Sequence, residues 1–290
     1  MSDEIVFVNG EFLPLKVASI SILDRGFTLG DGLFETLRAY DGNILRLEDH
    51  LNRLFQSADK IFLKLPYAKD SLIQLIYEVL KENHLKEAYV RVTVTRGEGP
   101  PGLALPQNTR PSIVIYATQA SAIPKEYYNS GVKITTFPCS ASFTATISPQ
   151  IKSINYLSQI IIKELATRDG SFEGIILEDD HKVSEGTVSN IFIVKDGILK
   201  TPALSNSILP GITRKIILEL ASQNNVSYEE TEITLDDLQQ ADEVFISNTG
   251  VEILPVSQVD AIQIGNGAVG SITTSLRSSF FKIIEELRKK

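Results

Sequence analysis

The stretch Ile151-Lys152-Ser153-Ile154-Asn155-Tyr156-Leu157 is the most informative part of this 290-residue chain. Its lysine follows Pro149 and precedes a pattern that predicts a helix over residues 155–167. Glu185 comes later, in the segment Val183-Ser184-Glu185-Gly186-Thr187. A lysine amine can form an imine with an aldehyde cofactor, and a buried glutamate can keep a pyridine nitrogen protonated. The pair therefore suggests pyridoxal phosphate chemistry.

Taken singly, the two residues have ordinary explanations. A lysine is usually solvated, and Glu185 beside Gly186 is typical of a turn. A pyridoxal phosphate site also requires a phosphate cradle and a substrate pocket, so the rest of the chain must supply both.

The composition is that of a globular protein, with 43% hydrophobic and 22% charged residues. The net charge is −8 and no basic tract is present, which argues against a nucleic-acid partner. No apolar run approaches the roughly 18 residues of a membrane-spanning helix, so we expect no membrane partner.

Cysteine and histidine are rare. Cys139 is the only cysteine, which excludes an intrachain disulfide and favours a reducing compartment. The start Met1-Ser2-Asp3-Glu4 is acidic and lacks the basic and apolar regions of a signal peptide, so we expect a cytoplasmic protein. His50, His84 and His181 are far apart and show no zinc-ligand spacing, so we expect no metal.

The pattern of apolar and turn-forming residues predicts a mixed α/β (α+β) protein without regular βαβ alternation. Turns at Asn9-Gly10 and Asp41-Gly42 join the first two pairs of strands. The expected strands lie near residues 5–8, 11–15, 34–40, 43–47, 89–95, 112–116, 132–137, 174–177, 190–194, 243–246 and 252–256. The expected helices lie near residues 47–61, 72–80, 155–167, 212–221, 235–240 and 272–288.

A change of character over residues 117–131 predicts the boundary between two domains. The sequence Ala-Thr-Gln-Ala-Ser-Ala-Ile-Pro has few large apolar residues and no clear period, as is typical of a linker. We expect a small N-terminal α/β domain over 1–117, an interdomain linker over 118–131, and a larger, β-rich C-terminal domain with helices over 132–290 that binds the cofactor.

Two segments are candidates for binding an anion. Leu209-Pro210-Gly211-Ile212-Thr213-Arg214 precedes an apolar helical pattern, and the first amides of a helix attract phosphate. Its Pro-Gly bend would let the backbone approach a ligand closely, although an ordinary helix start explains the segment as well. Ser247-Asn248-Thr249-Gly250, at the end of an apolar strand, is a weaker candidate.

Three further side chains and one loop are candidates for ligand binding. Arg53 lies nearly opposite the leucine stripe of the helix over 47–61, so periodicity alone predicts a solvated surface residue. Tyr89 and Arg91 alternate along a strand and share one face, which suits carboxylate recognition or a polar outer sheet face. The glycine-rich loop over 97–103 has the flexibility to cover a pocket.

The order of the motifs is more specific than any one of them. The chain contains, in sequence, Asp24-Arg25-Gly26, Gly30-Asp31-Gly32-Leu33-Phe34-Glu35-Thr36, His50-Leu51-Asn52-Arg53-Leu54, Thr95-Arg96-Gly97, Lys152-Ser153-Ile154-Asn155-Tyr156-Leu157, Ser184-Glu185-Gly186, Gly211-Ile212-Thr213-Arg214 and Thr249-Gly250. Over nearly its whole length the chain therefore resembles the class IV aminotransferases, which are fold-type-IV pyridoxal 5'-phosphate enzymes. The family includes branched-chain and D-amino acid aminotransferases, (R)-amine transaminases and aminodeoxychorismate lyases.

The resemblance implies a role for each matching residue. Lys152 would be the Schiff-base lysine and proton shuttle, and Glu185 would be the partner of the pyridine nitrogen. The implied fold is two-domain, and the implied assembly is a homodimer in which loops of the neighbouring subunit help to close each pocket. The cofactor's phosphate and ring would be bound by Arg53, the amides of Ile212 and Thr213, Thr249 and, near the phenolic oxygen, Tyr156. The resemblance thus reverses the surface interpretation of Arg53.

A branched-chain aminotransferase is the first substrate interpretation. The Tyr-x-Arg strand of that subfamily is matched by Tyr89 and Arg91, which would orient the α-carboxylate and receive the side-chain carboxylate of glutamate. The amides of Thr249-Gly250 would form the carboxylate-binding turn, and Phe34 and Leu103 would line an apolar pocket. The expected reaction exchanges an amino group between a branched-chain L-amino acid and 2-oxoglutarate.

Other members of the family stay open as alternatives. D-amino acid aminotransferases carry an arginine and a histidine where this chain has Pro101 and Leu103, and a tyrosine at Phe34, although the segment over 152–155 is close to that branch. Thr36 stands where branched-chain enzymes usually have glycine and could match a threonine used by aminodeoxychorismate lyases. A non-catalytic scaffold that binds pyridoxal phosphate is a further alternative.

Overall fold

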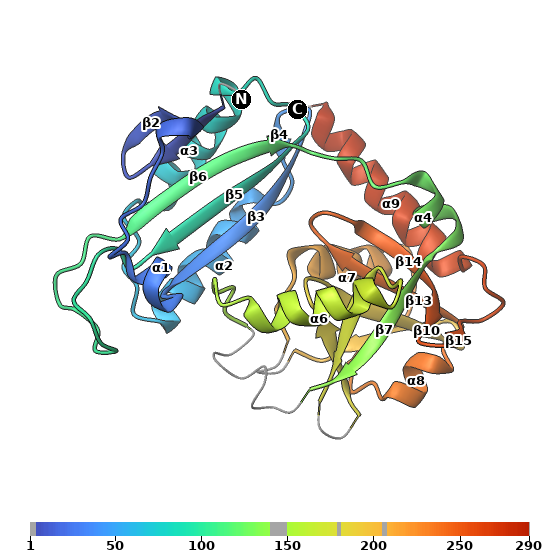
Figure 1. Ribbon diagram of the computed structural model, residues 1–290. Helices are drawn as coiled ribbons and strands as arrows, with labels where there is room; N and C mark the ends of the chain where they lie inside the picture. Colours follow the sequence, from blue (N-terminus) through green and yellow to red (C-terminus); the bar gives the residue numbers. More distant parts are fainter. Residues whose placement is uncertain (1–3, 140–149, 179–180, 205–207, 290) are drawn as a thin grey trace. The chain divides into compact units, whose positions relative to one another are not determined.

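The computed structural model describes residues 4–139, 150–178, 181–204 and 208–289. The chain divides into two compact units (Figure 1). Unit 1 contains Met1–Ser121, Ile151–Asn155 and Ile284–Lys290, and unit 2 contains Ala122–Gln150 and Tyr156–Ile283. Both units combine helices with a sheet, which confirms the predicted mixed α/β class.

Unit 1 is built on a six-stranded antiparallel sheet. Its strands are β1 Ile5–Val8, β2 Glu11–Pro14, β3 Gly32–Tyr40, β4 Asn43–Ile44, β5 Ala88–Thr95 and β6 Ser112–Gln119. Its helices are the 3-10 turn η1 Leu15–Val17, α1 Arg25–Leu29, α2 Leu47–Lys60 and α3 Lys69–Glu82. The strand order is β2-β1-β6-β5-β3-β4, and every neighbouring pair is antiparallel. Helices α2 and α3 pack against one face of this sheet.

Strict alternation of apolar and polar residues in β5 gives the sheet two different faces. Val90, Val92 and Val94 are fully buried on the helix-covered face, whereas Tyr89 and Arg91 are half-buried on the other face. β-Branched residues pack well on a pleated surface, and successive side chains of a strand point to opposite faces. The sheet therefore has one apolar face for the core and one polar face.

Unit 2 is built on a nine-stranded mixed sheet. Its strands are β7 Val132–Pro138, β8 Glu173–Leu177, β9 Val183–Gly186, β10 Asn190–Lys195, β11 Ile198–Pro202, β12 Tyr228–Thr231, β13 Glu243–Asn248, β14 Glu252–Val259 and β15 Ile262–Gln263. The order is β12-β11-β10-β13-β14-β7-β8-β9, to which β15 adds at β14. The pairs β11–β12, β14–β7 and β7–β8 are parallel. The helices that begin in unit 2 are α4 Lys125–Ser130, α6 Leu157–Arg168, α7 Ile212–Gln223, α8 Leu235–Gln239 and α9 Ser271–Arg288.

The predicted helices and strands are present, with small differences at their ends. Other elements were not predicted, because their sequences lack a clear period. In β12, Tyr-Glu-Glu-Thr carries no apolar alternation, and the strand forms by parallel pairing with β11 at the sheet edge. The short helix α4 lies inside the predicted linker, where the Tyr128 hydroxyl donates to the Val251 carbonyl.

The units also differ from the predicted domain boundaries. Residues 151–155 and 284–290 were predicted to belong to the C-terminal domain, but they group with unit 1. For residues 151–155 the cause is a set of backbone hydrogen bonds to β3, which cannot be read from local sequence. Within the described ranges, the helices are too short or too polar to cross a membrane.

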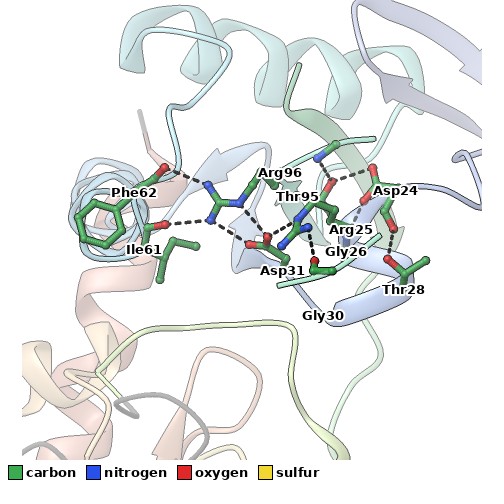
Figure 2. Close-up of polar contacts among 12 residues, drawn as sticks. Asp24, Arg25, Gly26, Thr28, Gly30, Asp31, Ile61, Phe62, Thr95 and Arg96 are labelled. Atoms are coloured by element: carbon green, nitrogen blue, oxygen red, sulfur yellow. Dashed lines mark hydrogen bonds and ion pairs between the residues drawn. The ribbon is translucent and has the colours of Figure 1, made fainter. Parts of the chain in front are cut away.

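A cluster of charged side chains organises the end of unit 1 that carries the loop over residues 97–111. Figure 2 shows the Asp31 carboxylate between two arginines. Arg25 donates from Nε at 2.9 Å, and Arg96 donates from Nε at 2.7 Å and from Nη2 at 2.9 Å. Burial raises the pKa of Asp31, but the hydrogen bonds and charges of Arg96 and Arg25 outweigh it and lower the pKa below its usual value.

The same arginines connect distant segments of the chain. Arg96 also donates to the carbonyls of Ile61 and Phe62 just beyond α2 (Figure 2). Arg25 donates from Nη1 to the Gly102 carbonyl at 2.9 Å. Gly102 precedes Leu103, so the Asp31 cluster holds the loop that carries this predicted substrate residue.

Asp24 closes the base of this loop. Its carboxylate accepts from the Gly26 amide at the start of α1 and from the hydroxyls of Thr95 and Ser112 on neighbouring strands. Gly97 turns the chain with a φ of +83°, and a Cβ there would lie 1.9 Å from the Arg110 carbonyl oxygen. A side chain at Gly97 would therefore force the two ends of the loop apart.

We expect Asp31→Asn to destabilise unit 1 strongly. The arginine side chains are only 4–5% exposed, and loss of their shared carboxylate leaves two buried cations without a charged partner. Removing one member of a buried ion pair typically costs about 3–5 kcal/mol, which urea denaturation would measure as a fall in the free energy of unfolding.

Asp41→Asn is the matched control for this prediction. It breaks an exposed ion pair with Lys86, and such a pair contributes little to stability. Equal losses in the two variants would contradict a structural role of the Asp31 cluster.

Candidate active site

The position of Lys152 is set by the backbone on either side of it. The Phe34 amide donates to the Lys152 carbonyl at 3.0 Å, and the Ile154 amide donates to the Gly32 carbonyl at 3.1 Å. Leu33 and Ser153 form an antiparallel bridge between these bonds. The segment Ile151–Asn155 therefore runs beside the start of β3, and Lys152 belongs to unit 1 although its neighbours in sequence belong to unit 2.

The polar face of the unit 1 sheet brings several predicted residues together. Thr36 on β3 pairs with Arg91 on β5, and Phe34 lies on the same face of β3 as Thr36. The Lys152 amine is 4.6 Å from the centroid of the Phe34 ring, and the Arg91 guanidinium carbon is 3.7 Å from it. Tyr89 lies on this face beside Arg38, whose guanidinium carbon is 5.1 Å from the tyrosine ring centroid. A lysine amine, two aromatic rings and two guanidinium groups thus share one surface.

Arg53 is not the solvated residue that its place on α2 predicted. It is 8% exposed, and its guanidinium donates from Nε to Glu35 Oε1 and from Nη2 to Glu35 Oε2, both at 2.7 Å. The surface interpretation was wrong because Glu35 reaches Arg53 from β3. A helix packed against a sheet can place a charged residue beside the apolar stripe when the strand supplies its counter-ion.

Glu35 and His50 are residues of this region to which the sequence assigned no role. Glu35 lies on the core face of β3, between Leu33 and Leu37, and its Oε2 is 2.8 Å from Nδ1 of His50. The signal was present in the sequence, because a charged residue at a core-facing strand position needs a partner. His50-x-x-Arg53 supplies two partners on one face of the following helix.

The protonation states in this cluster follow from burial and charge. Burial raises the pKa of Glu35, but the charge of Arg53 and the hydrogen bonds of His50 and Arg53 outweigh it and lower the pKa to about 2. Burial lowers the pKa of His50, against the raising effect of Glu35, and the positive charges of Arg53 and Lys152 lower it further. Glu35 is therefore ionised and His50 neutral near pH 7.

Leu103 lies at an exposed position of the loop over 97–111. Its side chain is 84% exposed, and the preceding carbonyl, that of Gly102, is held by Arg25. Within unit 1, the Leu103 side chain is thus exposed, while the hydrogen bond from Arg25 fixes the backbone at Gly102.

Unit 2 carries the second predicted cofactor residue, Glu185, on β9. Its Oε2 accepts a hydrogen bond from the Leu209 amide at 2.9 Å, and the Leu209 carbonyl accepts from the Asn190 side chain at 3.0 Å. These bonds connect Glu185 to the Leu209–Gly211 bend that leads into α7. The glutamate and the predicted phosphate cradle are therefore neighbours in unit 2.

The start of α7 has the properties of an anion site. Ile212 and Thr213 are its first residues, and Gly211 is its N-cap residue. Among the described residues, no side chain forms a capping hydrogen bond with this end of the helix, and its first turn contains no acidic residue. Gly211 packs closely against Asn190 at the bend, because a Cβ there would lie 2.0 Å from Asn190 Oδ1 and would displace that side chain. Both Ile212 and Thr213 are buried. First-turn amides without a side-chain acceptor suit a phosphate group.

The remaining predicted residues of unit 2 lie at element ends. Tyr156 is the N-cap residue of α6. Thr249 and Gly250 follow β13, where Asn248 Oδ1 accepts from the amides of Gly250 and Val251 at 2.7 and 2.8 Å. The Asn248 side chain therefore shapes the turn, and the Gly250 amide that was predicted to bind a carboxylate donates to Asn248 here.

Each unit carries groups whose chemistry suits a part of a cofactor with an aldehyde, a pyridine ring and a phosphate. Unit 1 carries the Lys152 amine and Arg53, and unit 2 carries the Glu185 carboxylate and the start of α7. Within the residues that the structure describes, His, Cys, Asp and Glu side chains form no group that could hold a metal ion.

The family pattern for amino-transferase class IV matches residues 32–259. A putative branched-chain-amino-acid aminotransferase from Methanocaldococcus jannaschii is 39% identical, over 95% of this chain and 94% of its own length. A D-alanine aminotransferase from Staphylococcus epidermidis is 34% identical, over 97% of this chain and 98% of its own.

Solved structures agree with the sequence relatives. The crystal structure of the Escherichia coli branched-chain amino acid aminotransferase matches with a TM-score of 0.92 at 31% identity, covering 98% of this chain and 95% of that one. A second branched-chain amino acid aminotransferase, complexed with N-(5'-phosphopyridoxyl)-L-glutamate, matches with a TM-score of 0.89 at 27% identity, covering 99% and 96%. The predicted fold type and aminotransferase activity are thereby confirmed, and this chain belongs to the class IV aminotransferases.

Proposed function

We propose that the protein is a pyridoxal 5'-phosphate-dependent transaminase that exchanges an amino group between a branched-chain L-amino acid and 2-oxoglutarate. The observation that carries the proposal is the placement of the Lys152 amine on the sheet face that also holds Phe34 and Arg91. The relatives that are branched-chain aminotransferases support it, as does the neighbour complexed with a phosphopyridoxyl derivative of L-glutamate.

Lys152 and Glu185 would carry the proton chemistry. When bound, pyridoxal phosphate weakens the Cα–H bond of an amino acid by drawing electrons into its ring. The Lys152 Nζ would hold the cofactor through its aldehyde carbon and, as a free amine, would carry the Cα proton of the substrate. The Glu185 carboxylate, oriented by the Leu209 amide, would keep the proton on the pyridine nitrogen.

The phosphate contacts would anchor the cofactor without taking part in bond changes. Arg53 would supply a positive charge, and the amides of Ile212 and Thr213 at the start of α7 would donate hydrogen bonds to the phosphate. Thr249 would add a hydroxyl from the turn shaped by Asn248, and Tyr156 would contact the phenolic oxygen of the ring.

Substrate recognition would rest on the polar face of the unit 1 sheet. Tyr89 would orient the α-carboxylate together with the turn at Thr249 and Gly250, and Arg91 would receive the second carboxylate of glutamate. Stacking on Phe34 and the bond from Nε to Thr93 at 3.3 Å give the Arg91 guanidinium a defined plane. The apolar wall for a leucine-like side chain would contain Phe34, Thr36 and Leu103.

A D-amino acid transaminase is the second candidate function. The D-alanine aminotransferases among the relatives favour it, at 34% identity. Against it, this chain has Pro101 and Leu103 where the arginine and histidine of the D-specific carboxylate trap are expected.

We further propose that the protein acts as a homodimer in the cytoplasm, where its single cysteine stays reduced. Two neighbouring segments of unit 1 expose large apolar side chains. Asp24 of the first segment and Glu98 of the second form a β-bridge. The first segment exposes Val17, Ile22, Leu23 and Phe27, and the second exposes Leu103. Exposed large apolar side chains on neighbouring segments favour an association site, which a second copy of the chain would cover symmetrically.

We expect Lys152→Ala to remove the visible absorbance of the purified protein and to lower turnover by about 10²- to 10⁴-fold or more, because the proton carrier is lost. Lys86→Ala, at an exposed lysine of the same unit, is the control and should keep both properties. Visible absorbance and turnover that persist without Lys152 would rule out the assigned role.

We expect L-leucine and L-glutamate to bleach the bound cofactor in half-reactions, and D-alanine and (R)-1-phenylethylamine to do so slowly. Arg91→Met should slow the L-glutamate reaction by about 10- to 100-fold, because a charge-assisted hydrogen bond is lost, and should leave L-leucine nearly unchanged. Fast bleaching by D-alanine and none by L-leucine would favour the second candidate. Release of pyruvate from aminodeoxychorismate would favour a lyase.

We expect Phe27→Asp to shift the protein from dimer to monomer in sedimentation experiments, because a carboxylate would be buried in the apolar contact. Tyr77→Asp, at a partly exposed aromatic residue of α3, is the control and should stay dimeric. A wild-type protein that sediments as a monomer at micromolar concentration would contradict the proposed assembly.

A further inference from the structure

Glu35 occupies a position that the apolar pattern of β3 assigns to the core. Leu33, Leu37 and Ala39 share its face and are fully buried, and Glu35 is likewise 0% exposed. The cost of burying a carboxylate is high unless charge and hydrogen bonds compensate it. Arg53 and His50 supply that compensation from α2.

The geometry of the cluster fixes the direction of the Arg53 guanidinium. The Nε–Nη2 edge meets both oxygens of Glu35 at 2.7 Å, in a bidentate arrangement that leaves little rotational freedom. His50 Nδ1 lies 2.8 Å from Glu35 Oε2 and so fixes the carboxylate in turn. His50 therefore orients the Glu35 carboxylate, and Glu35 in turn orients the Arg53 guanidinium.

Stability alone does not account for this arrangement. Replacement of a buried ion pair by apolar residues of similar volume is often neutral or stabilising, so a core that needed only stability would not require it. What the cluster supplies is a charged fork held in one orientation. The cluster lies in the same unit as the Lys152 amine, and the Lys152 charge acts on His50.

We propose that Glu35 and His50 are positioning residues that hold the Arg53 guanidinium in the orientation that recognises the phosphate of the cofactor. The inference rests on the proposed function, because it assumes that Arg53 contacts this phosphate. Glu35 and His50 themselves touch neither cofactor nor substrate in this assignment. They act through Arg53 by fixing its edge and plane.

The test compares pyridoxal phosphate with pyridoxal, which lacks only the phosphate. Protein freed of cofactor is titrated with each compound, and the visible absorbance gives two dissociation constants. The dissociation constant of pyridoxal divided by that of pyridoxal phosphate isolates the contribution of the phosphate to binding. A general loss of folding or of the Lys152 site instead changes both constants together. In the wild type we expect pyridoxal phosphate to bind much more tightly.

Glu35→Gln should lower this ratio by about tenfold or more, because the amide keeps one acceptor and replaces the other by a donor that repels Arg53 Nη2. Glu35→Asp, which keeps the charge and shortens the reach, should lower it as well. Arg53→Met should lower it at least as far, and the double variant with Glu35→Gln should fall no further than Arg53→Met alone. Glu87→Gln is the matched control, since Glu87 also pairs with an arginine of this sheet, Arg38, at 2.9 Å.

His50 provides a second route if the Glu35 variants fail to fold. His50→Leu should lower the ratio, and His50→Asn, whose amide can replace the Nδ1 donor, should restore it. Equal weakening of both compounds, an unchanged ratio, or a ratio raised by removal of the Glu35 charge would overturn the inference. A wild type that binds pyridoxal as tightly as pyridoxal phosphate would overturn it too, and a wild type that binds neither would overturn the proposed function itself.

Discussion

Backbone hydrogen bonds between the segment Ile151–Asn155 and the first residues of β3 are the constraint on which the candidate active site depends. Lysine carries its amine on a flexible four-carbon stem, so the amine has a defined place only when its backbone is held. The Phe34 amide and the Gly32 carbonyl hold it on either side. Gly32 permits the close packing of this region, because a Cβ there would lie 2.7 Å from the Val94 carbonyl oxygen.

The two faces of β3 then perform different tasks. Phe34 and Thr36 point to the polar face that holds the Lys152 amine, whereas Glu35 between them points into the core and meets Arg53. A shift of the strand by one residue would exchange these faces completely. The long antiparallel register of β3 with β5, from Gly32 with Thr95 to Ala39 with Ala88, prevents such a shift. One strand thereby couples the face that we assign to the substrate to the arginine that we assign to the phosphate.

Each unit orients its functional groups by its own hydrogen bonds. In unit 2 the Leu209 amide fixes Glu185, Asn190 fixes the bend before α7, and Asn248 shapes the turn at Thr249. In unit 1 the Asp31 cluster fixes the backbone next to Leu103. Groups held in place before a ligand arrives lose less freedom on binding, which favours both affinity and correct orientation.

The sequence by itself determined the helices and strands with clear periodicity, the mixed α/β class and the family, because these depend on local pattern and on motif order. The same motif order indicated the lysine and glutamate to which we assign the chemistry. It could not determine the partners of residues that are distant in sequence. Arg53 was predicted at the surface from its helix alone, and Glu35 and His50 received no role, since helical periodicity does not show which strand will cover a helix. Only the tertiary structure decided that a carboxylate of β3 meets His50 and Arg53, and that residues 151–155 join unit 1. Both outcomes follow from long-range pairing, whose energy comes from hydrogen bonds and charges that meet only after the chain has folded.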